Sequence, residues 1–131
     1  MKTLVVCYSK TGNAKKVAAA VAKELDCECC ELVYDEVGKT ISGAVEPSGY
    51  ERLILVCPIW AFELAEPMKL YLGKYGKSIK KYSLIVTCSL FGLRTCVNNC
   101  VKAIGSKPEK SMKIKGKNVK ANAFDITGIL Q

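Results

Sequence analysis

The chain is patterned as short apolar blocks separated by segments that are apolar on one side only. Continuous apolar runs rich in β-branched residues are typical of central parallel strands, which are buried on both faces. Such runs predict strands at residues 3–8, 53–57 and 84–88. Mixed or alternating polarity predicts two further strands, an edge strand at 27–34 and a fifth strand at 119–124.

Helices are predicted after the first, third and fourth of these strands. In 16–25, Val17, Val21 and Leu25 fall on one apolar stripe. The other two helices span 66–75, with a proline in the first turn, and 93–104, which Gly105 ends. Glycines and a proline make 35–50 a loop with at most one short helix, and the basic segment 106–117 is expected to be irregular. Alternation of strand and helix predicts a doubly wound α/β fold with a parallel sheet, as a single domain over 1–131.

Composition excludes several classes of function. The 131 residues carry a net charge of +8 and contain no histidine, so a Ser-His-Asp triad, a Cys-His dyad and a histidine metal ligand are all ruled out. No apolar run has the length of a signal peptide core or a membrane span, so we expect a cytoplasmic protein with no membrane association. The eight cysteines are expected to be thiols in the core or on the surface, not disulfides or a metal site.

A polar loop follows the first strand, where ligands bind in open α/β sheets. Hydroxyls and backbone N–H groups before a helix form an anion site, and Gly12 lets a ligand approach the backbone closely. The alternative is an ordinary helix cap by one of the loop's polar side chains. The candidate residues are Ser9, Lys10, Thr11, Gly12, Asn13 and Ala14.

Two more loops open on the same edge of the sheet. After the third strand, Trp60 can stack on a planar ligand or cover the core. The candidate residues there are Pro58, Ile59, Trp60, Ala61 and Phe62. After the fourth strand, a loop with one hydroxyl, two apolar side chains and a glycine is either a third wall of the site or a plain turn. Its residues are Ser89, Leu90, Phe91 and Gly92.

These loops together resemble the flavodoxin family, and the resemblance covers nearly the whole chain. The motifs that carry it are Ser-x-Thr-Gly-x-Ala at 9–14, Pro-Ile-Trp at 58–60 with Glu66-Pro67 after it, and Cys-Ser-x-x-Gly at 88–92. The resemblance implies a flavodoxin-like sandwich whose five parallel strands are ordered 2-1-3-4-5. It also implies bound FMN, with its phosphate at 9–14 and its isoalloxazine ring between the loops at 58–62 and 89–92. It further implies an electron carrier or a small flavin oxidoreductase, with redox proteins as partners and no catalytic residue.

Three departures from the family pattern are visible. The family often has threonine where Ala14 stands, a loss for which the charge of Lys10 could compensate. Flavodoxins are usually acidic, whereas this chain is basic. The seven residues after Phe124 are too few for the family's C-terminal helix, which we expect to be absent. The apolar face around Ile54 and Ile85 would then be covered by the 106–117 segment, by the C-terminal tail or by a second subunit, in a monomer or a homodimer.

Other functions compete with this interpretation. The chain could be a flavodoxin-fold domain without a flavin. Cys7, at the end of the first strand, could be the phosphorylated cysteine of a sugar phosphotransferase IIB-like domain. Low-molecular-weight tyrosine phosphatases need an arginine six residues after that cysteine, where Asn13 stands. The lysines of 107–120 are a solvated connection, a docking surface for an acidic redox partner or a nucleic-acid site, but no aromatics alternate with them, so we expect no nucleic-acid binding.

Overall fold

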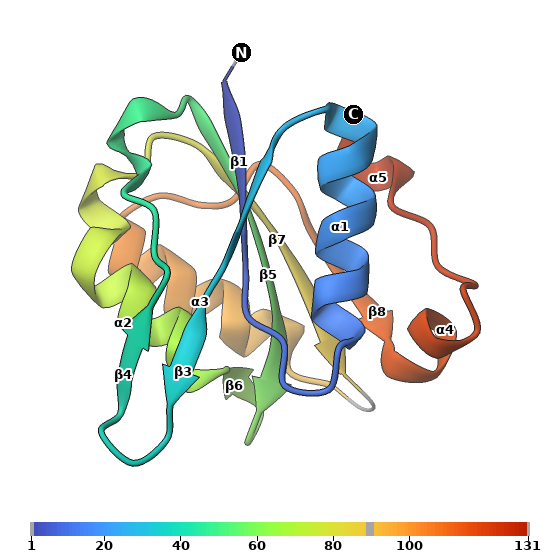
Figure 1. The fold of residues 1–131 in the computed structure, drawn as a ribbon. Coiled ribbons are helices and arrows are strands. Elements are labelled where there is room, and N and C mark those ends of the chain that lie inside the picture. Colours follow the sequence, from blue (N-terminus) through green and yellow to red (C-terminus); the bar gives the residue numbers. More distant parts are fainter. Residues whose placement is uncertain (1, 89–90, 131) are drawn as a thin grey trace.

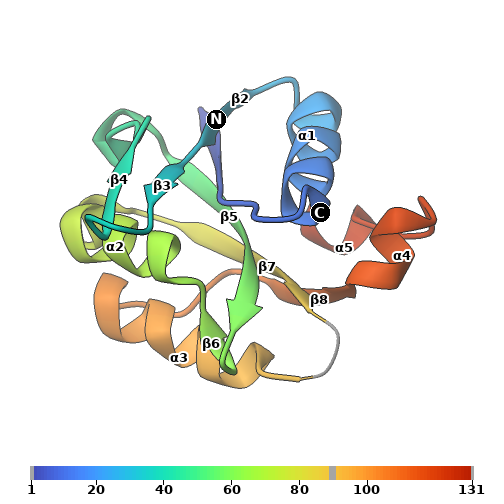
Figure 2. The same cartoon turned by 60° about the horizontal axis from the view of Figure 1, so that its bottom comes forward.

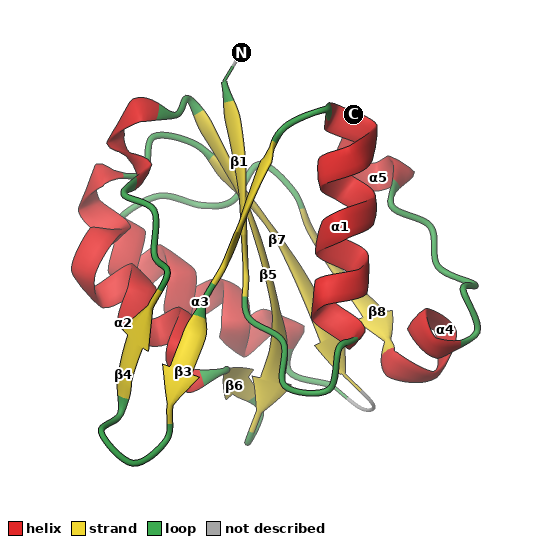
Figure 3. Ribbon diagram, in the orientation of Figure 1, coloured by secondary structure: helices red, strands yellow, loops and turns green. Residues whose placement is uncertain are grey.

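The computed structural model describes residues 2–88 and 91–130, which fold as a parallel sheet between two helical layers (Figure 1; Figure 3). Among the described residues, five parallel strands form the main path of a six-stranded sheet in the order β2-β1-β5-β7-β8, and this confirms the predicted order 2-1-3-4-5. Their bounds are β1 Thr3–Cys7, β2 Glu28–Glu31, β5 Arg52–Trp60, β7 Tyr82–Cys88 and β8 Ser111–Lys115.

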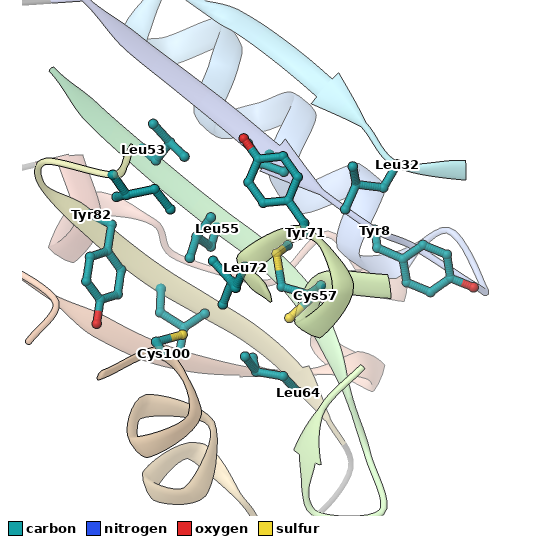
Figure 4. Close-up of a cluster of buried hydrophobic side chains, with 14 of the residues drawn as sticks. Tyr8, Leu32, Leu53, Leu55, Cys57, Leu64, Tyr71, Leu72, Tyr82 and Cys100 are labelled. Carbon is teal, nitrogen blue, oxygen red and sulfur yellow. The ribbon is translucent and has the colours of Figure 1, made fainter. Parts of the chain in front are cut away.

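Alternate residues of the central strands face two separate cores. Leu53 and Leu55 of β5 point into a core covered by α2 (Glu66–Tyr75) and α3 (Leu93–Ile104), where Tyr71 and Cys100 pack (Figure 4). Ile54 and Val56 point into a second core covered by α1 (Asn13–Leu25). Figure 2 shows the two helical layers on opposite sides of the sheet. The predicted bounds of α2 and α3 are confirmed, and α1 begins three residues before its predicted start.

The third predicted strand does not end before Pro58. Strand β5 continues to Trp60 and turns back through β6 (Glu63–Leu64), an antiparallel partner. Proline is tolerated here because β1 stops at Cys7, which pairs with Val56, so the β1 side of β5 needs no N–H donor at Pro58. Trp60 is therefore held at the end of a strand and not in a free loop.

The prediction of one edge strand over 27–34 was wrong. The chain forms β2, leaves the sheet after Glu31, and then forms β3 (Val33–Asp35), which pairs antiparallel with β4 (Thr40–Ser42). Two short 3-10 helices lie in the connections, η1 (Pro47–Gly49) before β5 and η2 (Gly76–Ser78) after α2. Strand β1 ends at Cys7, the partner of Glu31, so the parallel ladder has no partner for residues beyond Glu31, although Leu32 is still buried.

The fifth strand also lies elsewhere than predicted. It is β8, in the segment expected to be irregular, and its only buried residue is Ile114. Of the residues predicted as the strand, 119–120 end α4 (Gly116–Lys120) and 121–124 form a turn and a loop that lead to α5 (Thr127–Leu130). Lysines on both sides of Ile114 suit an exposed edge strand.

In place of one long C-terminal helix, which was not expected, the end of the chain forms the two short helices α4 and α5. Val119, Ile126 and Ile129 are at most 9% exposed and pack in the same core as Ile54 and Ile85. The C-terminal tail thus covers the apolar face for which a second subunit was the alternative. Within the described residues, no helix is both long and apolar enough to cross a membrane.

Candidate functional site

The loop between β1 and α1 has the geometry of an anion site. The Gly12 N–H donates to the Ser9 hydroxyl oxygen at 2.9 Å, and the first intrahelical bond runs from the Lys16 N–H to the Gly12 carbonyl at 3.0 Å. The amides of residues 13–15 therefore have no acceptor within the helix. Among the described residues, no side chain caps this helix, so the predicted alternative of an ordinary cap is wrong.

Gly12 has the conformation that such a loop needs. Its φ of +96° favours glycine, and a Cβ placed on it would meet nothing within 4 Å. The backbone is therefore open to a ligand from that side. The side chain of Ala14, in contrast, is buried in the core below α1, so only its backbone faces the loop's end.

A cavity of about 460 Å³ lies beside this loop, at the carboxyl ends of the strands. Of the predicted site residues that the structure describes, Thr11, Asn13 and Pro58 line it. Its volume is within the range of small-molecule sites. The other lining residues were not predicted: Thr87, Cys88, Lys115, Gly116, Lys117 and Lys120.

The β5–β6 hairpin and the start of α3 bring two exposed aromatic rings together. Phe62 and Phe91 are 52% and 64% exposed, and their rings stack with centroids 5.3 Å apart and an interplanar angle of 16°. Gly92 permits this approach, since a Cβ on it would lie 3.1 Å from the Phe62 carbonyl oxygen and 3.2 Å from Ile59 Cγ2. Figure 2 shows β6 beside the first turn of α3.

The turn that presents Phe62 is strained. Ala61 and Phe62 are the two residues between the paired Trp60 and Glu63, and their φ angles are +50° and +67°. Two-residue hairpin turns with both φ angles positive usually contain Asn and Gly. Left-handed conformations cost other residues about 1–2 kcal/mol each. Exposed apolar side chains on a strained turn are typical of a functional site rather than of a stable fold.

Trp60 lies against the core and not between the two loops. Its ring contacts Tyr8 edge-on, with centroids 5.5 Å apart, and Tyr34 at 6.1 Å. The Lys10 ammonium lies 5.6 Å from the centre of the Trp60 ring and 3.8 Å from a Glu36 carboxylate oxygen. Of the predicted aromatics, Phe62 and Phe91 are therefore the pair left open to a planar ligand. Ser89 and Leu90 lie outside the described residues.

The structure gives Cys7 no nucleophilic role. Its side chain is fully buried beneath α1. Its thiol donates a hydrogen bond to Cys29, and this bond together with burial raises the pKa of Cys7 far above the usual thiol value. A thiolate is the nucleophilic form, so the phosphocysteine alternative loses its reactive group. Within 2–88 and 91–130, no cluster of cysteines and carboxylates could hold a metal ion.

Comparison with known proteins identifies the fold. No family model and no curated protein sequence matches the chain. Among solved structures, a flavoprotein of Lactobacillus acidophilus in complex with FMN superposes with a TM-score of 0.72 at 18% identity, over 92% of this chain and 97% of that one. Flavodoxin 2 of Bacillus cereus gives 0.63 at 15% identity, over 94% and 95%. The flavodoxin of Streptococcus pneumoniae gives 0.60 at 16%, over 94% and 95%. The chain has the flavodoxin-like fold.

Proposed function

We propose that this chain binds FMN and serves as an electron carrier. The observation that carries the proposal is the cavity at the carboxyl ends of β5 and β7, which adjoins an uncapped helix N-terminus on one side. A doubly negative phosphate is favoured there by the free amides and the helix dipole. The structural likeness to an FMN complex supports the same ligand.

The residues fit each part of this cofactor. The phosphate would be held by the backbone of 9–14 with the hydroxyls of Ser9 and Thr11. The ribityl chain would cross the cavity past Pro58 and Thr87. The flavin ring would lie at Phe62 and Phe91. A ring held between these two side chains needs their planes about 7 Å apart, twice the contact distance of carbon atoms, so the stacked pair must separate.

The protein's own groups would bind and orient the cofactor. Bound FMN would supply reversible uptake and release of electrons, and no side chain of the site is needed as an acid, a base or a nucleophile. Exposed Phe62 and Phe91 leave the ring position open to a second protein, which suits electron transfer between proteins more than turnover of an enclosed substrate.

The basic segment at 107–120 suits an acidic redox protein as partner. Complementary charge accelerates the encounter of such proteins. All eight cysteines, each among the described residues, are free thiols, and this supports a reducing compartment such as the cytoplasm.

Reconstitution tests the proposal. The purified protein is incubated with FMN or with riboflavin, passed through a desalting column, and examined by visible absorbance. We expect one flavin per chain with FMN and much less with riboflavin, which lacks the phosphate. Anaerobic dithionite should bleach the bound flavin, and air should restore its colour. Elution of the protein without any flavin would contradict the proposal and favour a flavodoxin-fold domain that binds no cofactor.

A further inference from the structure

Three lysines line the cavity that contains the candidate phosphate loop. Lys115 ends β8, and Lys117 and Lys120 lie on α4. All three are exposed, and none of the described residues that line this cavity is a carboxylate. The cavity is thus polar and cationic on the β8–α4 side, in addition to the amides on the α1 side.

The lysine-bearing segment is fixed against the phosphate loop. Gly116 lies so close to Asn13 that a Cβ on Gly116 would be 3.0 Å from the side-chain nitrogen Nδ2 of Asn13. Val119, on the same helix, is fully buried in the core below α1. Figure 1 accordingly shows α4 beside the first turn of α1. The backbone that holds the three lysines is therefore positioned by packing, not by chance proximity of long side chains.

The charge of this cavity exceeds what one phosphate monoester neutralises. Such a group carries about −1.5 to −2 at pH 7, whereas the three lysines alone carry +3. The free amides at the start of α1 add further attraction for an anion. Two linked phosphates would match the lysines and the amides together, one on each side of the cavity.

We propose that Lys115, Lys117 and Lys120 form a second anion subsite, so that the cavity binds ligands with two linked phosphates more tightly than ligands with one. One phosphate lies at Thr11 and Asn13, and the other lies at the lysines. The proposal rests on the proposed function in so far as both use the same phosphate loop. The ligand class is a diphosphate, either inorganic pyrophosphate or the diphosphate of a nucleotide.

Calorimetric titration of the flavin-free protein with inorganic phosphate and with pyrophosphate, at fixed ionic strength, tests this subsite. We expect pyrophosphate to bind at least tenfold more tightly. The triple variant Lys115→Gln/Lys117→Gln/Lys120→Gln should lose most of that preference. A matched control, Lys77→Gln/Lys80→Gln/Lys81→Gln, removes the same charge at lysines outside this cavity. This control should keep the preference for pyrophosphate. The single variant Lys117→Gln gives a second readout if the triple variant does not fold.

The outcomes separate this proposal from the FMN proposal. Equal affinity for the two anions, or a preference that survives in the triple variant, overturns the second subsite whatever FMN does. A lysine-dependent preference in a protein that binds no FMN keeps the subsite and rejects the FMN proposal. Titration with ADP and AMP then identifies the source. A tenfold preference for ADP supports the subsite with a nucleotide as ligand, and a preference confined to pyrophosphate supports it with the inorganic ion.

Discussion

Phe62 and Phe91 stack ring on ring at 5.3 Å, although both are more than half exposed to solvent. Phe62 also has a φ of +67°, a conformation unfavourable for any side chain. An exposed ring on a strained turn contributes little to folding. Its conformation and exposure are explained if the ring serves a ligand, and this relationship leads to the first prediction.

Substituting Phe62 should change stability and FMN affinity in different ways. Phe62→Gly relieves the positive φ and should raise the free energy of unfolding by about 1 kcal/mol relative to Phe62→Ala. Both variants lose one stacking ring and should bind FMN about 5- to 150-fold more weakly, as expected for about 1–3 kcal/mol of stacking. Urea denaturation and flavin fluorescence measure the two effects.

Val37→Ala is the control for this pair, since Val37 is 96% exposed and lies outside the site. It should alter neither the free energy of unfolding nor the affinity for FMN. Wild-type FMN affinity in both Phe62 variants would show that the flavin ring does not lie at this turn.

The proposed phosphate loop should not tolerate a side chain at position 12. In Gly12→Ala the Cβ has open space, but the φ of +96° costs about 1–2 kcal/mol, and the methyl group occupies the side from which a phosphate approaches. FMN binding should be lost while the protein remains folded. Gly73→Ala, in the interior of α2 and equally free of contacts, should instead stabilise the protein by about 0.5–1 kcal/mol. Thermal melts and FMN titrations compare the two. Unchanged FMN affinity in Gly12→Ala would reject the loop as the phosphate site.

The C-terminal tail should be essential to the core below α1. Ile129 is 1% exposed and packs in the core that contains Ile54 and Ile85. Ile129→Ala should lower the free energy of unfolding by about 2–5 kcal/mol, the usual cost of such a cavity. Sedimentation should find the wild type monomeric, because the tail already covers this face. A loss below 0.5 kcal/mol, or a dimer of wild type, would mean that the tail does not cover the face in solution.

Cys29 should be more reactive than its neighbour Cys27. The Cys7 thiol donates a hydrogen bond to it, and this bond, with Lys15, lowers the pKa of Cys29. Burial instead raises the pKa of nearby Cys27. As the pH is raised, iodoacetamide should therefore modify Cys29 before Cys27, as followed by peptide mass spectrometry. Cys7→Ala removes the donor and should move the onset for Cys29 to higher pH. An onset that stays in place would show that Cys7 does not stabilise the Cys29 thiolate.

Local pattern was sufficient to predict the elements of the central fold. Strand β1 is encoded by a continuous apolar run and the stripe of Val17 and Val21 on α1 by helical periodicity, and Gly105 caps the end of α3, as the sequence predicts. The loop proposed to hold the phosphate could also be singled out, because its polar residues lie between a buried strand and a helix. These features depend on neighbours in the sequence, which is why they can be inferred without coordinates.

Features set by tertiary contact were missed. In β8 a single buried residue, Ile114, stands among lysines, so its strand character appears only when β7 is beside it. Val119 was assigned to a strand because it alternates with polar neighbours, but a single helical turn has the same pattern. The lysines that line the cavity come close to the loop after β1 through Gly116, and Phe62 meets Phe91 through Gly92. Both contacts join segments that are far apart in the sequence. No local signal reveals such approaches.

Titration of the protein with FMN, followed by tryptophan fluorescence, tests the central claim most directly. Trp60 is the chain's one tryptophan and lies at the end of β5, beside the proposed ring position. Flavins absorb where tryptophan emits, so bound FMN should quench nearly all of this signal, with saturation at one FMN per chain. Riboflavin, without the phosphate, should need a much higher concentration. Fluorescence that is unchanged at saturating FMN, after correction for absorbance, would contradict the assignment of this site to FMN.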